Sequence, residues 1–231
     1  MLAKSPGVPT HSVELFNGDR MTQKEFHRAY KKTPAGFKAE LIGGIVYAAS
    51  PLSLNHSEIH GFAAMTFGMY CAATHGVQFG DNATVVLAKD SEPQPDLFLR
   101  IRPEFGGQSK TEGGYIPGAP ELVAEIANAS HSLDLHSKSL DYQKHGVLEY
   151  LVVSIRENTI RWFDLAADKE LSAEADGIYR VRRFPGLWIH ARALLSRDAA
   201  LLTATLQKGL NSPEHAEFVK KLAGRHGGKR R

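Results

Sequence analysis

The 231-residue chain has little cysteine and no long apolar run. Its one cysteine, Cys71, cannot form an internal disulfide, and there is no cysteine cluster to hold zinc. No apolar stretch approaches the ~20 residues that a membrane helix requires, and residues 1–15 lack the apolar core of a secretory signal. We therefore expect a soluble cytoplasmic protein with no membrane partner.

The motifs of several enzyme classes are also missing. There is no Gly-x-x-x-x-Gly-Lys-Ser/Thr phosphate loop, no Gly-x-Gly-x-x-Gly motif after a strand, and no Gly-x-Ser-x-Gly nucleophile elbow. His56 and His60 have the i, i+4 spacing of a helical zinc pair, but Ser57 stands where a zinc protease needs glutamate. Nucleotide-dependent, α/β-hydrolase and zinc-protease chemistry are therefore not expected.

Charge is nearly balanced, with 28 lysines and arginines against 25 acidic residues and a formal net charge of +3. Much of the excess lies in the last residues, so we predict a basic tail over 226–231 that solubilises the terminus; a polyanionic partner is the other interpretation. The remaining divisions predicted are a mobile N-terminus over 1–12, one domain over 13–195, and a C-terminal helical appendage over 196–225.

Helix and strand patterns alternate along the chain. Thr22 and Glu25 form a capping box for a helix that ends near residue 31, and Gly43-Gly44 predicts a turn between two strands over 40–47. Further predicted helices cover 55–74 (with Asn55 as the N-cap), 133–145 and the segment after Ser212. Predicted strands cover 84–88, 96–101, 122–127, 149–155 and 159–165, the last pairing with 177–183, and a Gly-rich loop covers 106–118. This alternation predicts an α/β or α+β domain with a mixed sheet.

Two acidic residues stand out against this pattern. Glu125 has apolar neighbours on both faces of its predicted strand, and a buried carboxylate without a partner costs several kcal/mol. A salt bridge or an edge position facing water would also explain it. Asp96 opens the strand over 96–101, where a turn aspartate is common. If the two strands pair, both carboxylates reach one ion, and two carboxylates with a backbone carbonyl and waters form a magnesium site.

Lys138 lies on the predicted helix over 133–145. Its spacing from Leu135 and Tyr142 places all three side chains on one face of that helix. A functional position and an i, i+4 ion pair with Asp134 both explain a lysine there.

The order of the motifs resembles that of the bacterial Uma-type endonucleases, in the restriction-endonuclease-like PD-(D/E)XK superfamily, over about residues 20–195. The residues that carry the resemblance are Glu40-Leu-Ile-Gly-Gly, Ser50-Pro51, His56, Gly80-Asp81-Asn82-Ala83-Thr84-Val85, Pro95-Asp96, Glu121-Leu-Val-Ala-Glu125-Ile126, Ser130, Asp134-x-x-x-Lys138, Tyr142 and Gly146-Val147-x-Glu149-Tyr150.

The resemblance implies a fold, a reaction and site residues. The fold is a mixed β-sheet core flanked by helices, with extra β-hairpins, and the reaction is DNA phosphodiester hydrolysis dependent on Mg²⁺ or Mn²⁺. Asp96 and Glu125 would be the catalytic acids and metal ligands, and Glu40 an accessory acid. The superfamily places a lysine two residues after the second acid, where this chain has Ala127; Lys138 resembles the migrated equivalent.

The same resemblance makes His56 an accessory residue without an assigned role, and a homodimer is expected by analogy with enzymes that cut two strands. Two other functions remain open. One is a nucleic-acid-binding or regulatory module with little catalysis, which Ala127 and the modest net charge favour. The other is an unrelated metal hydrolase that acts on a small phosphate ester. Target sequence, strand preference and the choice between DNA and RNA are not encoded in any recognisable motif.

Overall fold

The computed structural model describes residues 14–48, 52–127 and 133–228. The predictions for residues 1–12, for Ser50-Pro51 and Ser130, and for the tail beyond 228 lie outside these ranges, as does the side chain of Asp134. The helices are α1 (Gln23–Tyr30), α2 (Leu54–Ala73), α3 (Ser139–Lys144), α4 (Ala191–Ser196), α5 (Ala199–Leu210) and α6 (Pro213–Gly228), with a 3₁₀ turn η1 (Pro103–Phe105) and a π-helical turn η2 (Leu133–Lys138). None of the helices in the described ranges is long and apolar enough to span a membrane.

Twelve strands accompany these helices in the described ranges. They are β1 (Ala39–Ile42), β2 (Ile45–Ala48), β3 (Val77–Asp81), β4 (Val85–Val86), β5 (Leu97–Ile101), β6 (Ile116–Pro117), β7 (Leu122–Ala127), β8 (Glu149–Ser154), β9 (Thr159–Asp164), β10 (Lys169–Leu171), β11 (Ile178–Arg180) and β12 (Trp188–His190). Six of them form one mixed sheet in the order β10-β9-β8-β7-β5-β3. Only β7 and β8 run parallel in it, and the connection between them contains η2 and α3.

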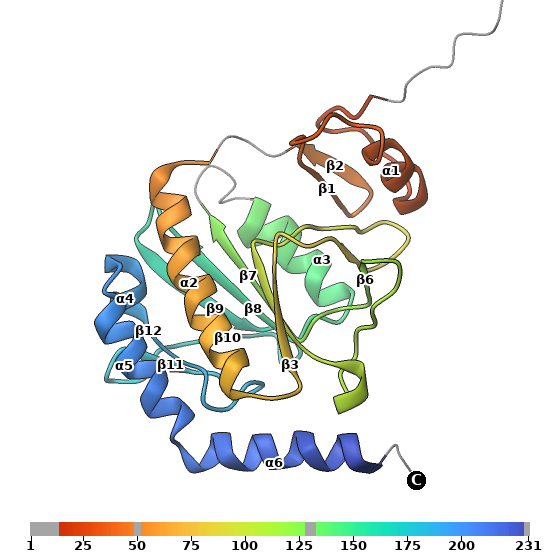
Figure 1. Ribbon diagram of the computed structural model, residues 1–231. Coiled ribbons are helices and arrows are strands. Elements are labelled where there is room, and N and C mark those ends of the chain that lie inside the picture. Colours follow the sequence, from red (N-terminus) through yellow and green to blue (C-terminus); the bar gives the residue numbers. More distant parts are fainter. Residues whose placement is uncertain (1–13, 49–51, 128–132, 229–231) are drawn as a thin grey trace, which may run out of the picture.

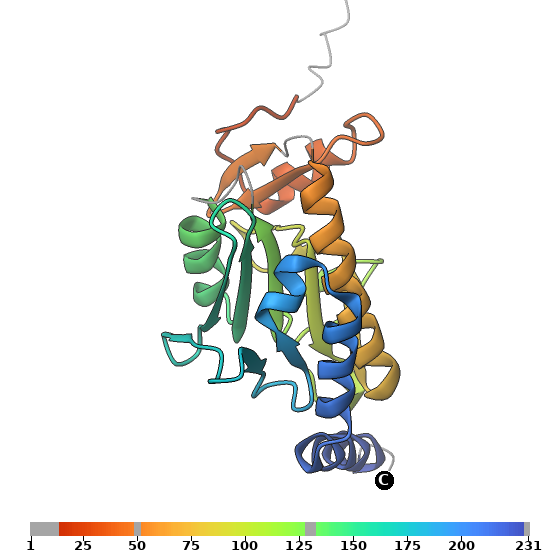
Figure 2. The ribbon, with the colours of Figure 1, turned by 90° about the vertical axis from the view of Figure 1, so that its left-hand side faces the viewer.

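Helices cover both faces of this sheet (Figures 1 and 2). The larger core lies on the α2 and α5 side and includes Leu122, Ala124 and Ile126 of β7. The alternate residues Val123 and Ala127 face the other core, to which α3 contributes Tyr142. Because side chains alternate along a strand, Glu125 shares the α3 face with these last residues. The sequence prediction of an α/β fold with a mixed sheet between helices is confirmed.

The N-terminal unit, residues 14–48, has a small core of its own. The predicted capping box is present, because Glu25 N–H donates to Thr22 Oγ1 while Thr22 N–H donates to Glu25. The predicted hairpin is also present, and Gly43 and Gly44 adopt the positive φ angles of 57° and 79° that its turn requires. The core of the unit is formed by Leu15, Phe26, Ala29, Ala39, Leu41 and Val46. Figure 1 shows the unit beyond the end of the sheet where β7 finishes.

The helices after residue 196, predicted as an appendage, pack against the domain. Leu202 and Leu206 of α5 and Leu222 of α6 belong to the larger core, together with residues of α2 and the sheet. Tyr70 of α2 donates a hydrogen bond to the Pro185 carbonyl, close to the same helices.

Several local predictions were wrong. The α2 N-cap is Ser53, because its side chain accepts the His56 N–H, and Asn55 lies inside the helix. The 84–88 strand is reduced to β4, which pairs with β6 inside the predicted Gly-rich loop. Strand β9 pairs with β8 on one side and, after a short turn, with β10 on the other. Strand β11 lies in the segment predicted to pair with β9, but it pairs with β12.

Strand β3 was not predicted at all. Its apolar residues Val77 and Phe79 alternate with Gln78 and Gly80 over only four residues, and the strand lies at the sheet edge next to β5. The glycine is required by packing, because a Cβ at Gly80 would collide with the ring of Phe98 on β5. The predicted helix over 133–145 is present, but its first six residues form the π-helical turn η2.

Candidate active site

Asp96 and Glu125 lie side by side at one end of the sheet. Strands β5 and β7 pair antiparallel with Leu97 opposite Ala124, which brings the two acidic residues next to each other. The Ile126 N–H donates to Asp96 Oδ2 at 2.7 Å, and the Asp96 N–H donates to Glu125 Oε2 at 3.4 Å. The condition stated from the sequence, that these two strands pair, is met, and the pairing joins residues that are far apart in the sequence.

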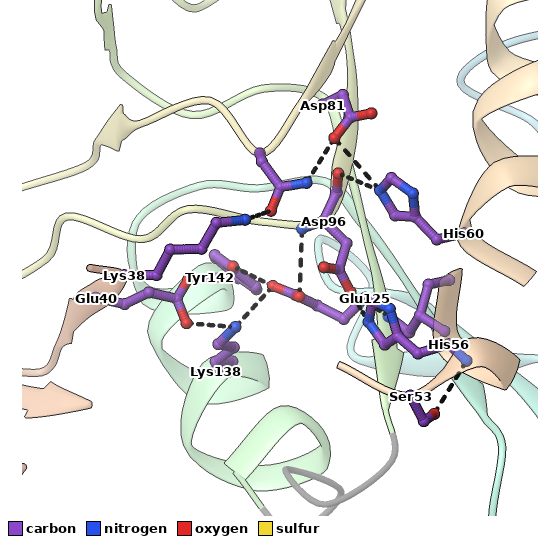
Figure 3. A network of polar contacts seen from close by, with 12 residues as sticks. Lys38, Glu40, Ser53, His56, His60, Asp81, Asp96, Glu125, Lys138 and Tyr142 are labelled. Carbon is purple, nitrogen blue, oxygen red and sulfur yellow. Dashed lines mark hydrogen bonds and ion pairs between the residues drawn. The ribbon is translucent and has the colours of Figure 1, made fainter. Parts of the chain in front are cut away.

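Lys138 extends from the end of η2 to Glu125 of β7 and Glu40 of β1 (Figure 3). Its side chain is buried, with the residue only 4% exposed. Nζ lies 3.0 Å from Glu125 Oε1 and 2.8 Å from Glu40 Oε2. The Tyr142 hydroxyl donates to the same Glu125 oxygen at 2.9 Å. The helical face predicted from the spacing of Lys138 and Tyr142 thus points at Glu125.

Glu40 reaches the site from β1 of the N-terminal unit. Besides its ion pair with Lys138, its Oε1 accepts the Gln94 N–H at 2.7 Å. Gln94 belongs to the segment just before Asp96, and this segment also pairs with β1 through the bridge between Leu41 and Glu92. The N-terminal unit is thereby tied to the strand end that carries Asp96.

Two histidines of α2 border Asp96 on the other side. His56 Nε2 lies 3.4 Å from Asp96 Oδ2, and its buried Nδ1 has no hydrogen-bond partner in the described part of the chain. The His60 ring stacks on the His56 ring at 6.0 Å. His60 Nε2 lies 3.3 Å from the Asp96 carbonyl oxygen and 3.4 Å from Asp81 Oδ1. The helical spacing of the histidines, noted in the sequence, places them along this acidic site.

Sequence reasoning missed three contributors to the site. Asp81 lies at the end of the unpredicted strand β3, so no strand pattern pointed to it. His60 was weighed only as half of a zinc pair. Tyr142 was placed on the correct helical face, but its hydrogen bond to Glu125 depends on the packing of α3 over β7. For His60, its helical spacing from His56 was the signal that could have placed it in the site.

The electrostatics of the site favour an ionised Asp96. Burial raises the pKa of this carboxyl, but the hydrogen bonds from His56 and the Ile126 N–H outweigh it, and the pKa lies below its ordinary value. The positive charge of Lys138 acts in the same direction. Tyr142 keeps its proton at neutral pH, because burial and the nearby Glu125 raise its pKa well above the ordinary value.

The carboxylates outnumber the positive charges of the site. Glu40, Asp96 and Glu125 surround one lysine, and all three are largely shielded from solvent. Hydrogen bonds hold these carboxylates, and their negative charge in excess of the one lysine is what a bound cation would balance. In the described residues no group of three or more His, Cys, Asp or Glu side chains has the arrangement of a metal cage. Mg²⁺ commonly uses only one or two carboxylates with waters, which Asp96 and Glu125 can supply, and Asp96 Oδ1 accepts no hydrogen bond from the described residues.

The mixed sheet with two acids at the ends of adjacent strands and a buried lysine beside them matches the arrangement that the resemblance to the Uma-type endonucleases implies. The model of the Uma2 family, described as "Putative restriction endonuclease", matches residues 23–194. The chain belongs to this family.

A solved structure shows the same fold. It is the crystal structure of a putative nuclease belonging to DUF820 from Anabaena variabilis ATCC 29413, with a TM-score of 0.62 and 18% sequence identity. The similarity covers 76% of this chain and 98% of that one. No curated protein matches the chain.

Proposed function

We propose that the protein is a metal-dependent endonuclease that hydrolyses phosphodiester bonds of DNA. The observation that carries the proposal is the adjacency of Asp96 and Glu125 at the end of β5 and β7, with Lys138 in contact with Glu125. Membership of a family described as restriction endonucleases supports a nuclease activity.

Asp96 and Glu125 are the residues that would hold Mg²⁺ or Mn²⁺. When bound, the ion would neutralise charge on the phosphate and lower the pKa of a bound water, which supplies a nucleophile at neutral pH. The lowered pKa of Asp96 suits this role, because the carboxylate is then ionised without the ion.

The chain's own residues would hold the acids and balance charge. Tyr142 and Lys138 both donate to Glu125 Oε1 and leave that carboxylate little freedom to rotate. Glu40 holds the Lys138 ammonium at the site from the opposite side. A fixed cation beside the reacting phosphate stabilises negative charge that develops in the transition state.

In this proposal Lys138 would take the role of the lysine that the superfamily pattern places at residue 127. Ala127 is fully buried against the α3 side of the sheet. A lysine from η2 reaches Glu125 from that same side. The ammonium group is therefore present although its place in the sequence differs from the superfamily pattern.

The alternative function, a nucleic-acid-binding or regulatory module, is favoured by one feature. Lys138 already forms ion pairs with both Glu125 and Glu40, so the acids are partly neutralised without a metal. A module of this kind would bind DNA without cutting it and would not need Mg²⁺ at the two acids.

The test is cleavage of supercoiled plasmid with Mg²⁺ or Mn²⁺ and with EDTA. Wild type is compared with Asp96→Ala, Glu125→Gln and a matched control, Glu217→Gln, which changes an exposed acid on α6. We expect metal-dependent nicking or linearisation by wild type and the control and none by the site variants. Equal cleavage by all four proteins would show contamination and refute the site. Binding of DNA without cleavage by wild type would favour the regulatory module.

A further inference from the structure

Helix α1 and the turn after it carry a concentration of positive charge. Residues 23–32 contain four basic residues and one acidic residue, in a chain whose formal net charge is only +3. The basic residues are Lys24, Arg28, Lys31 and Lys32, and all four are exposed. Phe26 and Ala29 on the same helix are buried in the core of the N-terminal unit. Helical spacing places Lys24, Arg28 and Lys31 on the opposite face.

These four charges have few interactions with the described protein: Arg28 acts electrostatically on Glu25, and Lys31 Nζ lies 5.5 Å from the centre of the Tyr115 ring. None of them forms an ion pair within 4 Å with any residue in the described ranges. The one carboxylate within the segment, Glu25, is held by the backbone N–H and hydroxyl of Thr22 at 2.8 and 2.7 Å. A solvated face usually carries both signs of charge, so an unpaired face of one sign indicates a polyanionic partner.

The basic face leads toward the proposed active site. The Tyr30 hydroxyl, at the end of α1, donates to the Phe37 carbonyl at 3.2 Å, which ties the helix end to the residue before Lys38. Lys38 directly precedes β1 and lies two residues before Glu40 in the sequence. Figure 3 shows Lys38 at the edge of the acidic cluster, with its Nζ 3.1 Å from Asn82 Oδ1.

We propose that Lys24, Arg28, Lys31, Lys32 and Lys38 form a basic track that binds the phosphate backbone of DNA beside the cleavage site. This inference rests on the proposed function for the identity of the substrate. Exposed lysine and arginine contacts to phosphates supply affinity and register without reading sequence. The small core beneath α1 holds the track as one rigid unit, and the same unit supplies Glu40 to the active site.

The experiment measures binding of a fluorescent DNA duplex by anisotropy over a range of salt concentrations, without divalent metal so that no cleavage occurs. Wild type is compared with a track variant in which Lys24, Arg28, Lys31 and Lys32 are all changed to Gln. The control variant removes the same charges elsewhere, as Arg182→Gln, Lys208→Gln, Lys220→Gln and Lys221→Gln. Each control residue is exposed and none has an ion pair among the described residues. Circular dichroism and thermal unfolding check that both variants are folded.

We expect the track variant to bind DNA at least about tenfold more weakly at 0.1 M salt, and the slope of log K against log salt to fall by about 2–4, since each phosphate contact contributes about 0.9. The control variant should keep most of the wild-type slope of log K against log salt. Lys38→Gln alone should lower the slope by about one contact.

Equal losses in the track and control variants would mean that binding is diffuse, and would overturn the track. Wild-type binding by a folded track variant would overturn it as well. Either result would leave the proposed function standing if wild type still cuts plasmid. Absence of both DNA binding and cleavage by wild type would refute both proposals.

Discussion

Replacing Lys138 by Met tests how the acidic site is balanced. The change keeps the unbranched chain as far as Cε and removes the ammonium group, which leaves Glu125 and Glu40 without their ion pairs at 3.0 and 2.8 Å. Removal of one partner from a buried ion pair costs about 3–5 kcal/mol. The Glu40 side chain is 16% exposed, so solvent screens part of the loss, and we expect about 3 kcal/mol in EDTA, the low end of that range.

Divalent metal should restore part of this stability. A ligand at 100 times its dissociation constant stabilises the folded state by about 2.7 kcal/mol. Without the ammonium competing for the acids, the Lys138→Met variant should bind Mg²⁺ more tightly than wild type. We therefore expect the stability difference between the two proteins to shrink by at least about 1 kcal/mol, roughly a fivefold gain in relative affinity.

The assay is urea unfolding followed by tryptophan fluorescence, to which the buried Trp162 and also Trp188 contribute, with EDTA and with Mg²⁺. The matched control is Lys144→Met in the neighbouring helix, which removes a solvent-exposed ion pair with Asp90 at 2.7 Å and should have a much smaller effect with no dependence on Mg²⁺. Wild-type stability of Lys138→Met in EDTA would refute the ion-pair argument. A large loss that Mg²⁺ does not change would refute metal binding at Glu125.

Two further predictions concern stability away from the acidic site. Burial raises the pKa of Glu149 to about 7, so between pH 4.5 and 7 the folded state holds a proton that the unfolded state has lost. The free energy of unfolding should therefore fall by about 3 kcal/mol as pH rises from about 4.5 to 7. Glu149→Gln should flatten this pH dependence in urea unfolding, and an unchanged dependence would contradict the prediction. Gly80→Ala should destabilise the fold by about 1–3 kcal/mol because its Cβ meets the Phe98 ring. The control Gly61→Ala in α2, where a Cβ has open space, should be neutral or stabilising by up to about 1 kcal/mol. Equal thermal unfolding temperatures for the two variants would refute the packing argument.

The parts of the fold that depend on local pattern could be predicted from the sequence. The capping box of Thr22 and Glu25 and the Gly43-Gly44 turn involve only neighbouring residues, and both are present. The strand around Glu125 was predicted because apolar residues surround the carboxylate. These signals are short-range, since helix caps and tight turns are set by a few consecutive backbone conformations.

Strand partners and edge strands could not be predicted in the same way. The choice of β10 over β11 as the partner of β9 depends on which segments the rest of the fold brings together. Strand β3 pairs with β5 along its whole length, whereas its own alternation of Val77 and Phe79 with Gln78 and Gly80 is a short and weak signal. Pairing energy that comes from a distant segment leaves no local trace.

In the candidate site, too, some features could be predicted from the sequence and others depend on the tertiary structure. The sequence by itself determined which residue types are available and the faces of their elements, such as Lys138 and Tyr142 on one side of a helix. Only the tertiary structure decided that these residues meet. The register of β5 on β7 joins Asp96 to Glu125, and the packing of the N-terminal unit brings Glu40 to Lys138. Contacts between distant segments depend on sheet register and core packing, whereas sequence periodicity reports only the orientation of each element by itself.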